Sequence, residues 1–229
     1  MNDVNEKINN LYDALKKSNP EHLITNSESD IVIEGYPRSS NTFLVDYIRY
    51  LYDREGLEQL KIGHHTHNYK NVELGFAYKI PVIILIRAPE NAILSSYIYT
   101  GVESPLDNRF QHYISFYTDV KRDIDRVLVI RFEEVVNCID MVISKIRDRF
   151  GLPIPTPALS NDELAEVTDM ERKRGMKLHG DKYNTRNALP NKERNILKKK
   201  YSSLISEHSR MSEASELYLS LLSYLNETN

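Results

Sequence analysis

The sequence predicts an α/β domain with a mainly parallel sheet flanked by helices, followed by a helical C-terminal part. Three hydrophobic runs, at 30–34, 82–86 and 127–130, are each followed by a turn and then by a segment with helical spacing. Strands that alternate with helices in this way build parallel sheets through right-handed crossovers. Beyond Pro157 the chain is largely polar and its spacing is helical.

The strands are marked by different local signals. The run Val82–Ile86 is apolar without alternation, which is typical of a central strand covered on both faces. The β-branched run at 30–34 leads into a turn at Gly35, and residues 60–63 predict a weaker strand. Helical spacing is found at 4–18, 43–52, 90–100, 133–150, 161–175, 190–206 and 210–225.

Composition and charge exclude several classes of protein. With 229 residues, 41% hydrophobic and 28% charged, the chain is globular, and we expect a single domain over residues 1–229. A net charge of -3 gives no bulk attraction for nucleic acid or an anionic membrane, so we expect neither as a partner. Basic clusters at 171–174 and 198–200 are typical of solvated helix faces. The sequence carries no signal for the oligomeric state.

Location is indicated by what the sequence lacks. Its apolar runs are far shorter than the roughly 20 residues that cross a bilayer, and the first ten residues contain no apolar signal core. The single cysteine, Cys138, cannot form an internal disulfide, which fits a reducing compartment. We therefore expect a cytoplasmic protein.

The turn at residues 35–42, Gly-Tyr-Pro-Arg-Ser-Ser-Asn-Thr, is the first candidate site. A turn between a strand and a helix presents backbone N–H groups and the helix dipole to an anion, and Arg38 adds a positive charge. The alternative is an ordinary turn with Thr42 as the helix N-cap. The turn is not a Walker A motif, because Ser40-Asn41 stands where Gly-Lys is required, and this disfavours ATP hydrolysis.

Arg87 and Ser95 form the second candidate. Arg87 follows the central strand directly, at the carboxyl end where open parallel sheets bind ligands. Ser95 lies about two helical turns further on, so both side chains can reach one phosphate. The alternative for each residue alone is a surface role, with Arg87 ion-paired and Ser95 on a helix face.

His64, His65 and His67 form the third candidate, with three of the seven histidines of the chain. Clustered imidazoles are typical of a metal site or a general base. On an extended segment His65 and His67 share one face and His64 lies on the other, so the three rings cannot face one ion. We therefore expect no metal.

In this order, the motifs resemble those of the sulfotransferases that use 3'-phosphoadenosine 5'-phosphosulfate (PAPS). The run YPRSSNTF at 36–43 is similar to that family's 5'-phosphosulfate loop, and HTHN at 65–68 is similar to its Lys-Thr-His segment. Arg87-x-Pro and Ser95 match its 3'-phosphate motif with the customary spacing, and Phe132 looks like the aromatic residue near the adenine. The resemblance implies a three-layer P-loop-type domain.

The resemblance extends over about residues 30–201, with an N-terminal helix at 1–20 and a C-terminal helix at 202–229 outside it. Within the loop, Ser40 stands where the family has glycine, and Asn41 stands where it has threonine.

Residues 173–201 resemble the family's segment that closes over the nucleotide. The resemblance assigns Arg174 and Gly175 to the cofactor, and it leaves Lys173 and Arg186 as alternatives for the contact with the 3'-phosphate.

The resemblance implies a sulfotransferase that moves the sulfuryl group of PAPS to a hydroxyl or amine of a small-molecule or carbohydrate acceptor. The product is adenosine 3',5'-bisphosphate and no metal is needed. His67 takes the position of the general base, Arg38 stabilises charge on the leaving phosphate, and His65 stands where a lysine is usual. The cofactor contacts implied are Arg38, Ser39, Ser40, Asn41, Thr42, Phe43, Arg87, Ser95, Phe132, Arg174 and Gly175.

Other interpretations stay open on the sequence. Phe43 either stacks on the adenine or belongs to the core. Glu34, at the end of the first strand, is the next candidate for the base after the histidines. The chain as a whole is otherwise a P-loop small-molecule kinase, or a catalytically silent nucleotide-binding or interaction protein.

Overall fold

The computed structural model describes residues 2–101, 104–157, 159–186, 189 and 191–228. The chain divides into two compact units. The sheet unit consists of Met1–Ile86 and Asp119–Ala158, and the helical unit consists of Arg87–Thr118 and Leu159–Asn229. The expectation of a single domain stays a prediction.

The sheet has four strands in the order β2-β1-β3-β4, and every neighbouring pair is parallel. The strands are β1 (Ile31–Gly35), β2 (Ile62–His64), β3 (Val82–Ile86) and β4 (Leu128–Arg131). β1 and β3 lie at the centre and are buried at every residue, as the apolar run without alternation predicts. The predicted α/β class with a parallel sheet is confirmed.

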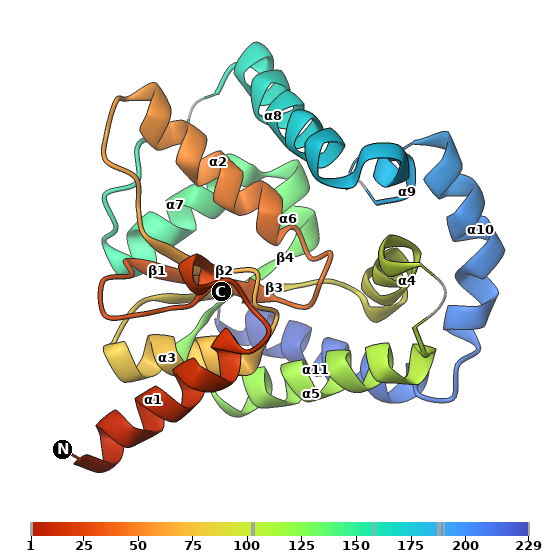
Figure 1. The fold of residues 1–229 in the computed structure, drawn as a ribbon, viewed down its shortest axis with the longest axis horizontal. Coiled ribbons are helices and arrows are strands. Elements are labelled where there is room, and N and C mark those ends of the chain that lie inside the picture. Colours follow the sequence, from red (N-terminus) through yellow and green to blue (C-terminus); the bar gives the residue numbers. More distant parts are fainter. Residues whose placement is uncertain (1, 102–103, 158, 187–188, 190, 229) are drawn as a thin grey trace. The chain divides into compact units, whose positions relative to one another are not determined.

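Helices cover both faces of this sheet (Figure 1). The helices of the sheet unit are α1 (Asn2–Lys16), α2 (Asn41–Arg54), α3 (Tyr69–Tyr78), α6 (Phe132–Asn137) and α7 (Ile139–Phe150). Figure 1 shows α2 and α7 on one face and α3 on the other. The predicted N-terminal helix, α1, packs on α3 through Leu11, Leu15 and Leu74.

The helical unit contains only helices in the part that the structure describes. They are α4 (Pro89–Thr100), α5 (Leu106–Arg122, whose last turn belongs to the sheet unit), α8 (Asn161–His179), α9 (Tyr183–Arg186), α10 (Lys192–Ser206) and α11 (Met211–Thr228). Within this unit α9, α10 and α11 all contact α4. The predicted C-terminal helices are thus confirmed, although residue 190 lies outside the described residues. No described helix is both long and apolar enough to cross a bilayer.

Three features differ from the expected pattern. The segment 133–150 forms two helices, because Cys138 leaves the helical conformation at φ -142° and ψ 44°. Helix α3 has no counterpart among the predicted elements, since its buried positions include Asn71 and Gly75, which give no hydrophobic signal. Helix α5 was also not expected, yet its buried Phe110, Tyr113 and Tyr117 repeat at helical spacing and carry the signal that would have found it.

Gly75 allows α3 to approach the sheet closely. A Cβ at this position would lie 2.8 Å from Val82 Cγ2 and 2.9 Å from Val32 Cγ2. We expect Gly75→Val to lower the free energy of unfolding by about 2 kcal/mol or more through overpacking, measured by urea denaturation. Ala77→Val on the exposed side of the same helix is the control, because it changes only helix propensity. Equal losses in the two variants would contradict the close approach.

Candidate functional site

The loop between β1 and α2 has an unusual backbone. Arg38 and Ser40 have φ values of 75° and 73°, in the left-handed region, while Ser39 between them does not. Such alternation turns successive backbone N–H groups toward one concave point, which is a recurring way to bind anions. Ser40 takes the conformation that glycine adopts without strain, so the substituted position keeps a glycine-like backbone.

Helix α2 begins at Asn41 with an uncapped N-terminus. Its N-cap residue, Ser40, makes no side-chain capping hydrogen bond. The first N–H groups of a helix have no partner within it and carry the positive end of the helix dipole. The alternative with Thr42 as the N-cap is therefore wrong, because Thr42 is the second residue of the helix.

The loop also contains buried polar atoms without partners. Among the described residues, neither Ser39 Oγ nor Asn41 Oδ1 has a hydrogen-bond partner, although Asn41 Nδ2 reaches Tyr36 O at 3.5 Å. A buried hydroxyl without a partner is costly in an empty loop and becomes satisfied as a donor to a bound oxyanion. These observations fit a loop that binds a phosphate-like group.

The first of the three histidines is the last residue of a strand, and the other two lie on the turn that follows it. β2 ends at His64, and His65 and His67 have φ values of 59° and 51°. The expected alternation of faces is therefore wrong. The His64 and His65 rings are 4.7 Å apart between centroids, and the His65 and His67 rings 5.7 Å apart. No group of three metal-binding side chains suited to a metal ion occurs in the described parts of the chain.

The buried carboxylate of Glu34 on β1 holds this turn. Its Oε1 accepts from Thr66 N (3.0 Å), Thr66 Oγ1 (2.8 Å) and Asn71 Nδ2 (2.9 Å), and its Oε2 accepts from His67 N (3.0 Å). Burial raises the pKa of the Glu34 carboxyl, and these four hydrogen bonds oppose the rise. Because Glu34 has no exposed surface, its role is to position the turn, and it does not itself touch a bound molecule.

His67 has a defined tautomer. Its Nδ1 lies 2.7 Å from Gly35 O, and since a carbonyl oxygen only accepts, Nδ1 carries the proton and donates it. Burial lowers the pKa of His67 to about 4, with a further contribution from the nearby Arg38 cation and opposition from the Gly35 hydrogen bond. At neutral pH the ring is therefore uncharged and its Nε2 carries a lone pair, as a general base requires.

In the helical unit, Ser95 belongs to a hydrogen-bonded pair that the sequence did not predict. Arg194 Nη2 donates to Ser95 Oγ at 2.9 Å, and Arg194 Nη1 donates to Thr185 O at 2.5 Å. Both Arg194 and Ser95 are 3% exposed, so a guanidinium is held inside the unit beside Ser95. Nothing in the spacing distinguishes Arg194 from the other basic residues of α10. Arg87 begins this unit directly after β3, and its carbonyl accepts from Tyr113 Oη at 2.7 Å.

The remaining predicted residues lie on helices. Arg174 and Gly175 are in the interior of α8 rather than in a loop, with Arg174 exposed and a Cβ on Gly175 2.9 Å from the Tyr183 ring. Phe132 is the half-buried first residue of α6. Phe43 is half-buried in the first turn of α2, with its ring centroid 6.3 Å from that of Tyr47.

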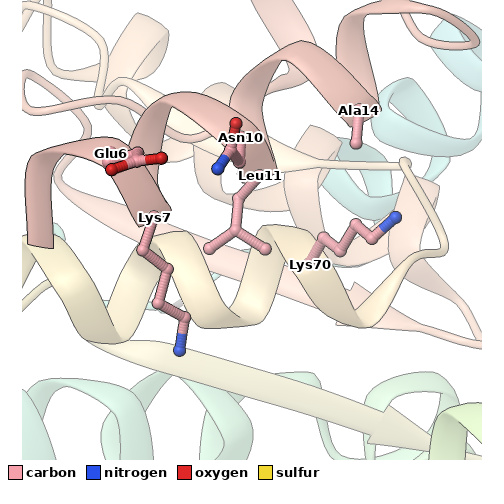
Figure 2. A pocket seen from close by; sticks show the side chains of 6 residues that line it. All are labelled: Glu6, Lys7, Asn10, Leu11, Ala14 and Lys70. Atoms are coloured by element: carbon pink, nitrogen blue, oxygen red, sulfur yellow. The ribbon is translucent and has the colours of Figure 1, made fainter. Parts of the chain in front are cut away.

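A hollow of about 440 Å³ lies elsewhere in the sheet unit, between α1 and the start of α3 (Figure 2). It is lined by Glu6, Lys7, Asn10, Leu11, Ala14 and Lys70. It contains none of the predicted site residues.

Comparison with known proteins bears on the fold. No protein-family model matches the chain, and the search of curated protein sequences finds no match. Among solved structures, the chain is similar to mouse sulfotransferase SULT7A1 complexed with PAP, with a TM-score of 0.50 and 13% identity over 92% of this chain and 93% of that one. The chain therefore has a sulfotransferase-like α/β fold.

The low pKa of His67 gives a pH-dependent prediction. In an NMR titration from pH 8 to 5 we expect the His67 ring to stay neutral, whereas in the urea-unfolded chain it should titrate near 6.5. Because the folded-state pKa is the lower one, its contribution to stability is complete above about pH 6.5 and is lost as the pH falls through 4. His67→Asn should remove that part of the acid dependence. Titration of folded His67 near 6.5 would contradict this environment.

Proposed function

We propose that the chain is a sulfotransferase that moves the sulfuryl group of PAPS to a hydroxyl or amine of a small-molecule or carbohydrate acceptor. The fold, which it shares with a PAP-bound sulfotransferase, is compatible with this reaction but does not establish it. The observation that carries the proposal is a neutral histidine, His67, beside an anion-binding loop and within the electrostatic influence of Arg38.

In this proposal the loop residues hold PAPS, the molecule that supplies the sulfuryl group. PAPS, when bound, supplies a sulfuryl group on a phosphate that leaves. The backbone N–H groups of residues 39–42 and the Ser39 hydroxyl donate to the phosphate oxygens, and Arg38 adds a positive charge. Charge on the leaving phosphate grows as its bond to sulfur breaks, so these donors stabilise the transition state more than the ground state.

His67 activates the acceptor in this proposal. Its Nε2 lone pair takes the proton of the acceptor hydroxyl or amine, while Nδ1–H remains bonded to Gly35 O. A bound polyanion raises the pKa of a neighbouring imidazole, so bound PAPS makes His67 a stronger base than it is in the free protein. The hydrogen bond from His67 N to the Glu34 carboxylate keeps the backbone that carries the ring in place during the transfer.

The 3'-phosphate is assigned to the helical unit. Arg87 and Ser95 are the residues that the sequence motif indicates, and the buried Arg194 beside Ser95 adds a second guanidinium. Arg87, Ser95 and Arg194 belong to the helical unit, and the loop belongs to the sheet unit. Arg174 remains an alternative contact on α8.

The substituted loop bears on the alternative of a catalytically silent protein. Ser40 replaces the family's glycine but keeps a glycine-like φ of 73°, which supports a working loop. A small-molecule kinase has no support from the loop, because the Gly-Lys pair of the Walker motif is missing.

Nucleotide binding tests the assignment of the 3'-phosphate. We expect calorimetry to show binding of adenosine 3',5'-bisphosphate without divalent metal and much weaker binding of AMP. Arg87→Ala and Arg194→Ala should each weaken the bisphosphate by about ten- to a hundred-fold, because each removes a charge-assisted hydrogen bond. Arg172→Ala, on the exposed face of α8, is the control. Equal affinities for the two nucleotides would refute the assignment.

Turnover tests the role of His67. With PAPS and a panel of phenols, sugars and amines, we expect His67→Ala to slow sulfuryl transfer about a hundred- to ten-thousand-fold. Calorimetry should show nearly unchanged binding of the bisphosphate. His22→Ala, at an exposed histidine, is the control. Near-normal turnover in the His67 variant would show that the base lies elsewhere.

A further inference from the structure

His64 and His65 belong to a series of hydrogen bonds that connects Arg49 with Thr42 and does not pass through His67. Arg49 Nη2 lies 3.2 Å from His64 Nε2, and the Nδ1 atoms of His64 and His65 are in direct contact. At the other end, His65 Nε2 lies 2.7 Å from Thr42 Oγ1. The series of hydrogen bonds thus begins at the Arg49 guanidinium on α2, passes through the two imidazoles, and ends at Thr42 at the start of the same helix.

Arg49 fixes the direction of every bond in this series. A guanidinium only donates, so His64 Nε2 must accept and carries no proton. The proton of His64 is therefore on Nδ1, and it is donated to Nδ1 of His65. His65 then holds its own proton on Nε2 and donates it to Thr42 Oγ1. Protonating His65 on both nitrogens would place two N–H groups against each other, so this arrangement keeps His65 neutral.

The series of hydrogen bonds ends at the Thr42 hydroxyl, which lies in the anion-binding loop. Because Thr42 Oγ1 accepts from His65, its own proton is directed to another acceptor. Thr42 lies in the first turn of α2, where the backbone N–H groups also donate outward. The hydroxyl is thereby available as a donor to an oxyanion, like the first backbone N–H groups of the helix.

We propose that Arg49 and His64 are positioning residues that act through His65 to fix Thr42 as a hydrogen-bond donor to the anion bound by the loop. The identity of that anion, the 5'-phosphate side of PAPS, rests on the proposed function. His65 is then a neutral connector and not a substitute for the charge of a lysine. The polarity of the series of hydrogen bonds follows from the contacts in the sheet unit alone.

The ring tautomers of the free protein test the polarity directly. In ¹⁵N-labelled protein, long-range ¹H–¹⁵N spectra identify which nitrogen of each imidazole is protonated, with assignments from single His→Asn variants. We expect the proton on Nδ1 of His64 and on Nε2 of His65. A proton on His64 Nε2 overturns the proposal whatever the protein binds. If the tautomers are as expected but the protein does not bind adenosine 3',5'-bisphosphate, the series of hydrogen bonds is supported. The proposed function is then contradicted instead.

A double-mutant cycle tests the effect on the anion. Arg49→Met removes the donor, and we expect it to weaken binding of adenosine 3',5'-bisphosphate about tenfold in calorimetry, with Arg49→Lys retaining most of the affinity. In a Thr42→Val background, Arg49→Met should have no further effect, because the hydroxyl through which it acts is gone. Additive losses would overturn the proposal. Circular dichroism and urea midpoints exclude variants that fail to fold.

Discussion

The candidate site depends on one buried charge. Glu34 is fully buried on a central strand, and a carboxylate in that position is tolerated only when donors surround it. The donors come from Asn71 on α3 and from the turn after β2, including the backbone N–H groups of Thr66 and His67. The need to satisfy this carboxylate therefore fixes the turn, and with it the place of the His67 ring.

The carboxyl end of β1 contacts the His67 ring and leads into the loop at 35–42. Gly35 follows Glu34 and leads directly into the loop that carries Arg38, and its carbonyl oxygen accepts a hydrogen bond from His67 Nδ1. It must be glycine, since a Cβ there would lie 2.5 Å from Leu85 O on β3. Close packing of β1 on β3 thus fixes both the carbonyl that binds the His67 ring and the start of the loop. The proposed transfer depends on such positioning.

Backbone strain is concentrated at the same place. Of the five described non-glycine residues with positive φ, four are Arg38, Ser40, His65 and His67, and the fifth is the cap of α3. Each such conformation costs free energy that the surrounding hydrogen bonds must offset, and strain of this kind gathers at functional sites. The Ser39 hydroxyl, which has no hydrogen-bond partner among the described residues, adds to the cost of the loop without an anion. A bound oxyanion would accept from this hydroxyl and so offset part of that cost.

The sequence by itself determined the parallel sheet, its strands and the loop at 35–42, because apolar runs, glycines and prolines act on the chain locally. It indicated the histidine cluster at 64–67 as a candidate site, and only a family resemblance singled out His67 within it. The extended conformation expected for the segment was wrong, because His65 and His67 lie on a turn. Tertiary structure decided that conformation, the tautomer of His67 and the pairing of Arg194 with Ser95. Glu34 and His67 are 33 positions apart and Ser95 and Arg194 are 99 apart, so these contacts exist only after folding. Donors and acceptors that meet across such separations leave no periodic trace in the sequence, because the requirement to satisfy a buried polar group fixes their geometry and not their spacing.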